Sequence, residues 1–116
     1  MNVTCYTCLK EFESLECWVM HVLRSVDKNR KHNKHNNKSL QFVLSFLERR
    51  QILSGGKYKF WVDDGCYNER GDLTRFLMHN SISNKSHFVP VPELKFKKVG
   101  LTKDLTETEI ISLQQS

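Results

Sequence analysis

Three residues near the start of the chain have the types and the spacing of metal ligands. Cys5 and Cys8 are separated by two residues, and His21 follows thirteen positions after Cys8. A close-set cysteine pair on a turn supplies two thiolates, and a histidine on a following helix reaches the same ion. A segment this short has no room for a core of its own, so a bound metal would supply much of the energy that folds it. We therefore expect a Zn2+ site at this end of the chain.

Residues 5–21 resemble the two-cysteine, two-histidine zinc finger. The resemblance rests on the cysteine pair, on Phe12 at the aromatic position, on Trp18 at the aliphatic position and on His21 as the third ligand. It implies a hairpin and a helix folded around one zinc ion. The chain departs from the family after His21, because positions 25–27, where the fourth ligand is expected, contain no histidine.

The fourth ligand has several candidates. His32 is the first choice and His35 the second, although a continuous helix would put His32 about 16 Å from the histidine of the motif. Residues 27–37, DKNRKHNKHNN, contain no apolar residue, so a break in the helix is expected there. Asp27, at the end of the same helix, and Cys17, one turn before the histidine of the motif, are the alternatives. The competing interpretation of the motif is a pair of reduced, buried cysteines without a metal.

The composition of the whole chain favours an acidic partner. The 116 residues are 39% hydrophobic and carry a formal net charge of +5, which points to nucleic acid first. The sequence shows neither a signal peptide nor an apolar stretch of membrane-spanning length, so we expect an intracellular protein, nuclear if eukaryotic, with no membrane partner. We divide the chain into a finger-like module with a basic extension, residues 1–36, and a small α+β domain, residues 37–116. The oligomeric state stays open, and a dimer is possible.

A basic segment follows the third ligand and contains one acid, Asp27. Its basic residues are Arg24, Lys28, Arg30, Lys31, Lys34 and Lys38. We call it the basic strip. It is predicted to contact phosphates, with Lys57 and Lys59 as additional contacts; a solvated linker is the alternative interpretation.

Periodicity and capping residues predict an α+β fold, with the finger of hairpin and helix packed on a small helix and β-hairpin domain. In the N-terminal part we expect a knuckle over 3–12, a helix over 15–27 capped by Ser14, and a helix from Leu40 capped by Ser39. These are followed by a hairpin over 52–62 that turns at Gly55 and Gly56, and by a polar loop over 63–71. The rest of the chain is expected to form a short helix over 72–80, an extended stretch over 87–101 and a last helix capped by Thr106 and Glu109.

Two enzyme families also show partial resemblance. Residues 71–84 resemble the GNxxRFxNHSCxPN segment of SET-domain lysine methyltransferases, and the matching positions are Gly71, Arg75, Phe76, His79 and Asn84. That resemblance implies a cofactor contact at His79, but Met78 replaces the family's asparagine, and no tyrosine follows Tyr67 to act as the catalytic one. We interpret His79 instead as the C-terminal residue of a helix.

The second partial resemblance is to HNH-like nucleases. It rests on His32, Asn33 and His35 beside a cysteine pair, where a histidine would activate water and a divalent metal would hold the phosphate.

These observations favour a non-enzymatic, zinc-binding protein that binds nucleic acid or has a regulatory role. The alternative is a protein-interaction module, such as an inhibitor or adaptor, with a purely structural zinc and with Trp61 and Tyr67 as docking residues. Salt separates the two classes, since a complex held by phosphate contacts weakens steeply as salt rises.

Overall fold

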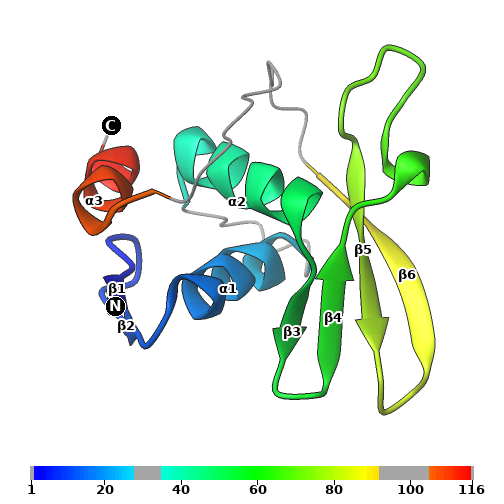
Figure 1. Ribbon diagram of the computed structural model, residues 1–116, viewed down its shortest axis with the longest axis horizontal. Coiled ribbons are helices and arrows are strands. Elements are labelled where there is room, and N and C mark those ends of the chain that lie inside the picture. Colours follow the sequence, from blue (N-terminus) through cyan, green and yellow to red (C-terminus); the bar gives the residue numbers. More distant parts are fainter. Residues whose placement is uncertain (1, 28–34, 92–104, 116) are drawn as a thin grey trace.

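The computed structural model describes residues 2–27, 35–91 and 105–115, which form an α+β fold (Figure 1). Its elements, in order, are β1 (Val3–Thr4), β2 (Glu11–Phe12), α1 (Leu15–Asp27), α2 (Asn37–Arg49), β3 (Ile52–Ser54), β4 (Tyr58–Trp61), the short 3-10 helix η1 (Asp64–Cys66), β5 (Arg75–Asn80), β6 (Lys85–Pro90) and α3 (Glu107–Gln115). None of the described helices combines the length and the apolar content needed to cross a membrane.

The N-terminal hairpin has the form that the sequence predicts. β1 and β2 pair antiparallel, and the connection between them closes through two backbone bonds, from Cys5 N to the Lys10 oxygen at 2.8 Å and from Leu9 N to the Cys5 oxygen at 2.7 Å. Leu9 has φ +61°, a left-handed conformation that tightens this turn. Both cysteines of the motif therefore lie on one tight knuckle.

α1 has the predicted bounds, and it begins after its predicted cap. The Oγ of Ser14 accepts a hydrogen bond from Cys17 N at 3.2 Å, which satisfies one of the free amides of the first turn. Its apolar residues recur at helical spacing, and four of them are fully buried: Trp18, Val19, Val22 and Leu23. They pack against α2 and the larger sheet, so α1 belongs to the main core as well as to the knuckle.

α2 begins one turn earlier than predicted. Ser39 is not its cap: Asn36 occupies that position, and its Oδ1 accepts from Ser39 N at 2.8 Å, while Ser39 is buried inside the first turn. The amide Nδ2 of Asn36 donates to the carbonyls of Leu113 (2.9 Å) and Gln114 (3.1 Å) near the end of α3. One side chain thus joins the start of α2 to the end of α3.

The larger sheet is antiparallel in the order β3-β4-β5-β6. The hairpin of β3 and β4 turns at Gly55 and Gly56 as predicted, and both glycines have positive φ. The predicted helix over 72–80 is wrong, because Arg75–Asn80 forms β5 between β4 and β6. Phe76, Leu77 and Met78 are all buried, which hides the alternation that normally identifies a strand.

The extended stretch predicted over 87–101 is described only to residue 91. Its first part lies in the edge strand β6, where Pro90 is the last residue, a position that needs no inward backbone donor. The remainder lies outside the described residues.

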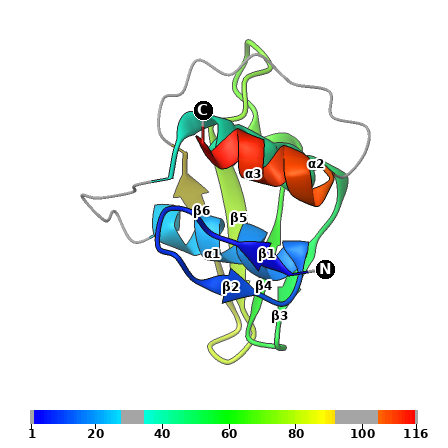
Figure 2. The same ribbon diagram turned by 90° about the vertical axis from the view of Figure 1, so that its left-hand side faces the viewer.

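α1 and α2 cover one face of the larger sheet, and α3 lies beside the N-terminal hairpin at the other end of the molecule (Figures 1 and 2). The reciprocal capping of α3 is confirmed: Thr106 N donates to Glu109 Oε1 at 3.1 Å, and Glu109 N donates to Thr106 Oγ1 at 3.3 Å. Gln114 then holds the hairpin from α3, accepting from Tyr6 N at 2.8 Å and donating to the Thr4 carbonyl at 2.9 Å. The hairpin is therefore fixed from both sides, by α1 and by α3.

Candidate metal centre

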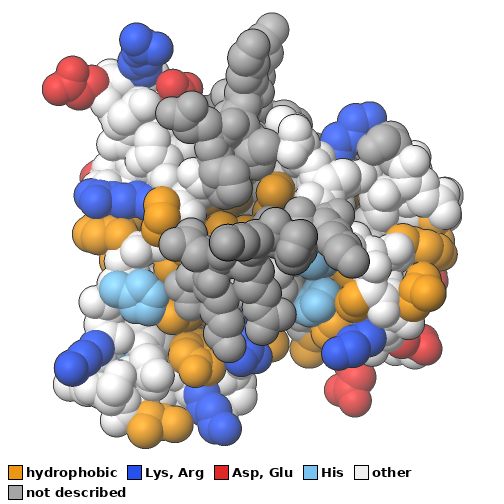
Figure 3. All heavy atoms as spheres, turned by 180° about the vertical axis from the view of Figure 1, so that it is seen from behind, with side chains coloured by type: hydrophobic (Ala, Val, Ile, Leu, Met, Phe, Trp, Pro, Cys, Tyr) orange, Lys and Arg blue, Asp and Glu red, His pale blue; other side chains and the backbone are white. Residues whose placement is uncertain are grey.

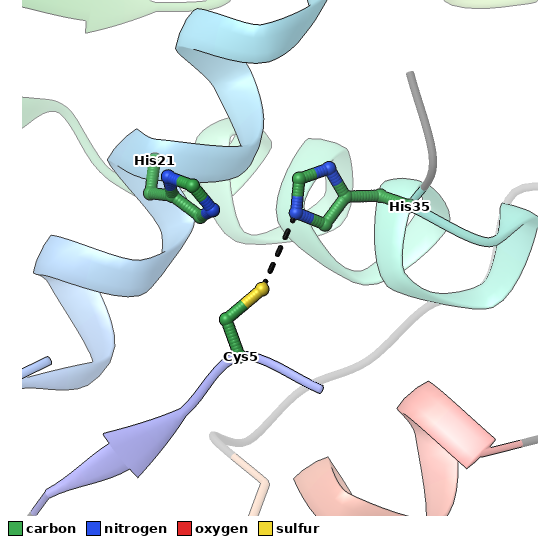
Figure 4. Close-up of side chains that lie close together, drawn as sticks. All are labelled: Cys5, His21 and His35. Carbon is green, nitrogen blue, oxygen red and sulfur yellow. Dashed lines mark hydrogen bonds between the residues drawn. The ribbon is translucent and has the colours of Figure 1, made fainter. Parts of the chain in front are cut away.

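Three separate elements bring Cys5, His21 and His35 together (Figure 4). Cys5 comes from the knuckle, His21 from the middle of α1, and His35 from the residue before the α2 cap. Their ligand atoms all lie within 4.8 Å of one another, and Cys5 Sγ is 3.4 Å from His35 Nε2. Cys5 is completely buried, and the two histidines are half-buried.

Cys8 lies at the edge of this group. Its Sγ is 3.4 Å from His21 Nε2, but the residue is exposed and does not join the group whose atoms are all within 4.8 Å of one another. A tetrahedral zinc ion, with bonds of about 2.3 Å to sulfur and about 2.0 Å to nitrogen, holds those two atoms about 3.5 Å apart. Both sulfur–nitrogen contacts match that separation. The two cysteines and two histidines thus fit zinc by donor type, and the ligand atoms of Cys5, His21 and His35 are the three that are grouped together.

Ser25 orients the His35 ring. The Ser25 hydroxyl donates to the Val22 carbonyl at 2.6 Å, so its oxygen is left to accept from His35 Nδ1, 3.2 Å away. The proton of a neutral His35 is therefore held on Nδ1, which leaves the Nε2 lone pair facing Cys5. A hydrogen bond on the second ring nitrogen is the usual support of a metal-binding histidine.

The electrostatics of the site favour a neutral His35. Burial, and secondarily the neighbouring His21, lower the pKa of His35 to about 4 from its ordinary 6.5. The ring is therefore uncharged at neutral pH, the form in which imidazole binds metals. The rings of His21 and His35 meet edge to face, with centroids 5.1 Å apart, and Phe12 packs on His21 at 4.8 Å. Phe12 thus shields one side of the site.

The other predicted ligands are placed differently. His32 lies outside the described residues. The side chain of Asp27 is likewise outside what the structure describes, whereas Cys17 is described and does not belong to the Cys5, His21 and His35 group. Sequence reasoning did not identify the role of Ser25, although its position four residues after His21, one helical turn away, was a usable signal.

Most of the basic strip, namely Lys28, Arg30, Lys31 and Lys34, lies outside the described residues. Its two described ends differ in environment. Arg24 places its guanidinium carbon 5.4 Å from the centroid of the Tyr58 ring, and Lys38 is exposed in the first turn of α2.

The segment that resembles methyltransferases, residues 71–84, contains β5 and the turn that leads into β6. His79 lies within β5, so its interpretation as a helix C-terminal residue is wrong; its Nδ1 is 2.7 Å from Ser86 Oγ on the next strand. Asn84, with φ +54°, forms part of the turn. Cys66 is buried, and burial raises the pKa of its thiol, so the reactive thiolate is disfavoured there.

Comparison with known proteins adds no relative: no family model, curated protein or solved structure matches this chain.

Proposed function

We propose that the protein binds one structural zinc ion through Cys5, Cys8, His21 and His35. We propose further that residues 22–34, the basic segment between His21 and His35, bind nucleic acid. The observation that carries the zinc site is the group of three ligand atoms within 4.8 Å of one another, with Cys8 Sγ 3.4 Å from His21. All four residues supply donor types that zinc prefers. No open position for a substrate is needed in this assignment, so the metal acts on folding rather than on chemistry.

The metal would add a link at the N-terminal hairpin, which is otherwise held by contacts with α1 and by the hydrogen bonds of Gln114. β1 and β2 contain two residues each, which is too short for a hairpin to be stable alone. A zinc ion bound to Cys5, His21 and His35 connects that hairpin to α1 and to the start of α2. Structural zinc contributes about 10–16 kcal/mol in isolated fingers, more than the whole stability of many domains.

The nucleic-acid part of the proposal rests on where the basic strip lies relative to the ligands. Residues 22–34, between His21 and His35, contain five Lys and Arg residues and the single acid Asp27. A segment fixed at both ends by ligands of one metal loses less freedom on binding than a free linker of the same composition. The charge then attracts phosphates, and binding releases their counterions.

Metal content is the first test. Protein purified without added zinc should contain about one zinc ion per chain by elemental mass spectrometry, and Cys5→Ser should lose it. Cys66→Ser is the matched control, since Cys66 is buried far from the hairpin, beside Asp63. Zinc retained in Cys5→Ser, or no zinc in folded protein, refutes the metal assignment.

The second test measures binding as salt is varied. The triple variant Lys28→Gln, Lys31→Gln, Lys34→Gln should bind DNA and RNA more weakly. Its plot of log affinity against log salt should be less steep by about 0.9 for each phosphate of duplex DNA that the variant no longer neutralises. Lys10→Gln and Lys85→Gln are controls outside the strip. If neither DNA nor RNA binds at low salt, the protein-interaction alternative replaces this function.

A further inference from the structure

The second face of the four-stranded sheet carries a row of aromatic and basic side chains. The helices pack on the face that buries Phe60, Phe76 and Val89. Side chains alternate along a strand, so the residues between these point the other way. We call that second face the open face, and its central residues are Lys59, Trp61, Arg75, Leu77, His79 and Phe88.

Two aromatic rings flank one aliphatic residue on this face. Trp61, Leu77 and Phe88 are Cα partners in register across β4, β5 and β6. Leu77 is only 8% exposed, whereas Phe88 is 42% exposed, and the 3-10 helix η1 packs against β5 on the side of Arg75. The two rings therefore shelter Leu77 and remain accessible themselves, Trp61 in part and Phe88 more fully.

A cation accompanies each ring. Lys59 Nζ lies 5.1 Å from the centroid of Trp61, and the guanidinium carbon of Arg75 lies 3.6 Å from the centroid of Phe88. Arg75 is held in place by its own hydrogen bond, from Nε to the Gly65 carbonyl at 2.9 Å. The guanidinium is thus a flat, positively charged surface fixed over the ring, and nucleic-acid bases stack on both kinds of surface.

The charge of the sheet has one sign. Lys59 and Arg75 are the charged residues of β4 to β6 that lie on the open face, because the same alternation puts Lys85 on the face of Val89. The acids Asp63 and Asp64 lie at the η1 end of this face, next to the Gly65 carbonyl that Arg75 contacts. Figure 3 shows Lys, Arg and His side chains without Asp or Glu at the lower left, where the hairpin ends of the sheet lie; the Asp and Glu side chains at the upper left and the lower right have Lys or Arg side chains beside them. A polyanion is therefore the complementary partner for this surface.

We propose that the open face binds single-stranded nucleic acid, with unpaired bases stacked on Trp61 and on the Arg75–Phe88 pair. Stacking on an exposed ring requires a base that is free of its duplex neighbours. The major groove of a duplex admits a helix or a two-stranded ribbon, but not the face of a four-stranded sheet. Lys59 and His79, adjacent in register, then lie beside the stacked bases, where Lys59 contacts phosphate.

This inference shares its ligand class with the proposed function but rests on a different surface. The zinc-loaded protein is titrated into a labelled oligothymidine of about 12 nucleotides, within the range that one such surface covers. Fluorescence anisotropy should show tighter binding to this strand than to a duplex of equal length. Trp61→Ala and Phe88→Leu should each weaken binding about 5- to 100-fold, the loss expected for one stacked base.

One control variant, the choice of a conservative test substitution and a check of folding separate stacking from damage to the fold. Tyr6→Ala removes another exposed aromatic residue, on the N-terminal hairpin, and should leave the affinity unchanged. Phe88→Leu keeps an apolar side chain at the same position, and circular dichroism with zinc content should confirm that each variant is folded.

Tryptophan fluorescence gives an independent readout. Trp18 is completely buried, so quenching by the oligonucleotide reports on Trp61 and should disappear in Trp61→Phe. Affinities within twofold of the parent in both Trp61→Ala and Phe88→Leu, or binding without quenching, would overturn the inference.

The two proposals fail in different ways. Duplex binding that depends on Lys28, Lys31 and Lys34, with no binding of single strands, overturns the open-face site and keeps the proposed function. Single-strand binding that depends on Trp61 but not on those lysines overturns the nucleic-acid role of the basic strip and keeps the open-face site. A protein partner that requires Trp61 and Phe88, with no oligonucleotide bound, also overturns the open-face site.

Discussion

Replacing His35 with alanine should remove the dependence of stability on zinc. His35 Nε2 is 3.4 Å from Cys5 Sγ, and its ring is fixed by Ser25, so no other described side chain is placed to take its role. The substitution leaves Asn36, the cap of α2, in position. The loss is therefore one of metal binding rather than of helix formation.

The magnitude follows from linkage. Zinc at 100 to 1,000 times its dissociation constant stabilises the folded state by about 2.7 to 4.1 kcal/mol. A chain of 116 residues has an unfolding entropy of about 0.24 kcal/mol/K, so each kcal/mol moves Tm by about 4 °C. Adding a strong chelator to the parent protein should therefore lower Tm by about 11 to 17 °C. In His35→Ala the change on chelation should be close to zero.

The assay is thermal unfolding by circular dichroism, with buffered zinc and with chelator, for the parent and three variants. His79→Ala is the matched control for His35→Ala, since His79 lies in the sheet and contacts Ser86, and it should keep the full response to zinc. His32→Ala decides between the two fourth ligands that the sequence offers. If His32→Ala abolishes the response and His35→Ala retains it, the argument from the geometry of His35 is wrong.

Three further predictions concern single side chains. Cys17→Ser should retain one zinc ion per chain by mass spectrometry, because Cys17 lies outside the ligand group. Asn36→Ala should lower the free energy of unfolding by about 1–2 kcal/mol in urea titrations, through loss of the α2 cap and of the bonds to α3. Burial, followed by the charge and hydrogen bond of Glu48, raises the pKa of Tyr67 to about 12. This folded pKa exceeds the unfolded value of about 10, so the protonated Tyr67 hydroxyl contributes to the free energy of unfolding. That contribution is fully present below pH 10 and is lost as the pH rises toward 12. An absorbance titration should show a tyrosine step near pH 12 that Tyr67→Phe removes.

Local signals in the sequence predicted the helices and turns whose causes are themselves local. Apolar spacing and Ser14 determine the start and the face of α1, and the capping pair of Thr106 and Glu109 predicts α3. Gly55 and Gly56 adopt positive φ at the hairpin turn, as their residue type suggests. In each case the interaction spans only a few residues, so the pattern is complete within a short window.

The errors arose where distant contacts decide the outcome. Residues 75–80 contain Leu and Met, which favour helices, and Leu77 is buried beside Trp61 and Phe88, its partners in register on the neighbouring strands. Strand pairing overrode helix propensity there. Likewise, the role of Asn36 as cap depends partly on the end of α3, more than seventy residues later in the chain. The contact between His35 and Cys5 also joins residues thirty positions apart, so no short stretch of sequence could show it.

The candidate metal site is connected to α2 and α3 through a few side chains. His35 lies at the centre, its neighbour Asn36 holds the last carbonyls of α3, and Gln114 of α3 returns to the hairpin that carries Cys5. This path closes on itself, so each member restricts the freedom of the others. Zinc would complete the path at its weakest point, the hairpin of two-residue strands. The sheet needs no such support, because its strands share the core with α1 and α2. Substitutions on its open face are therefore expected to leave the candidate metal site intact.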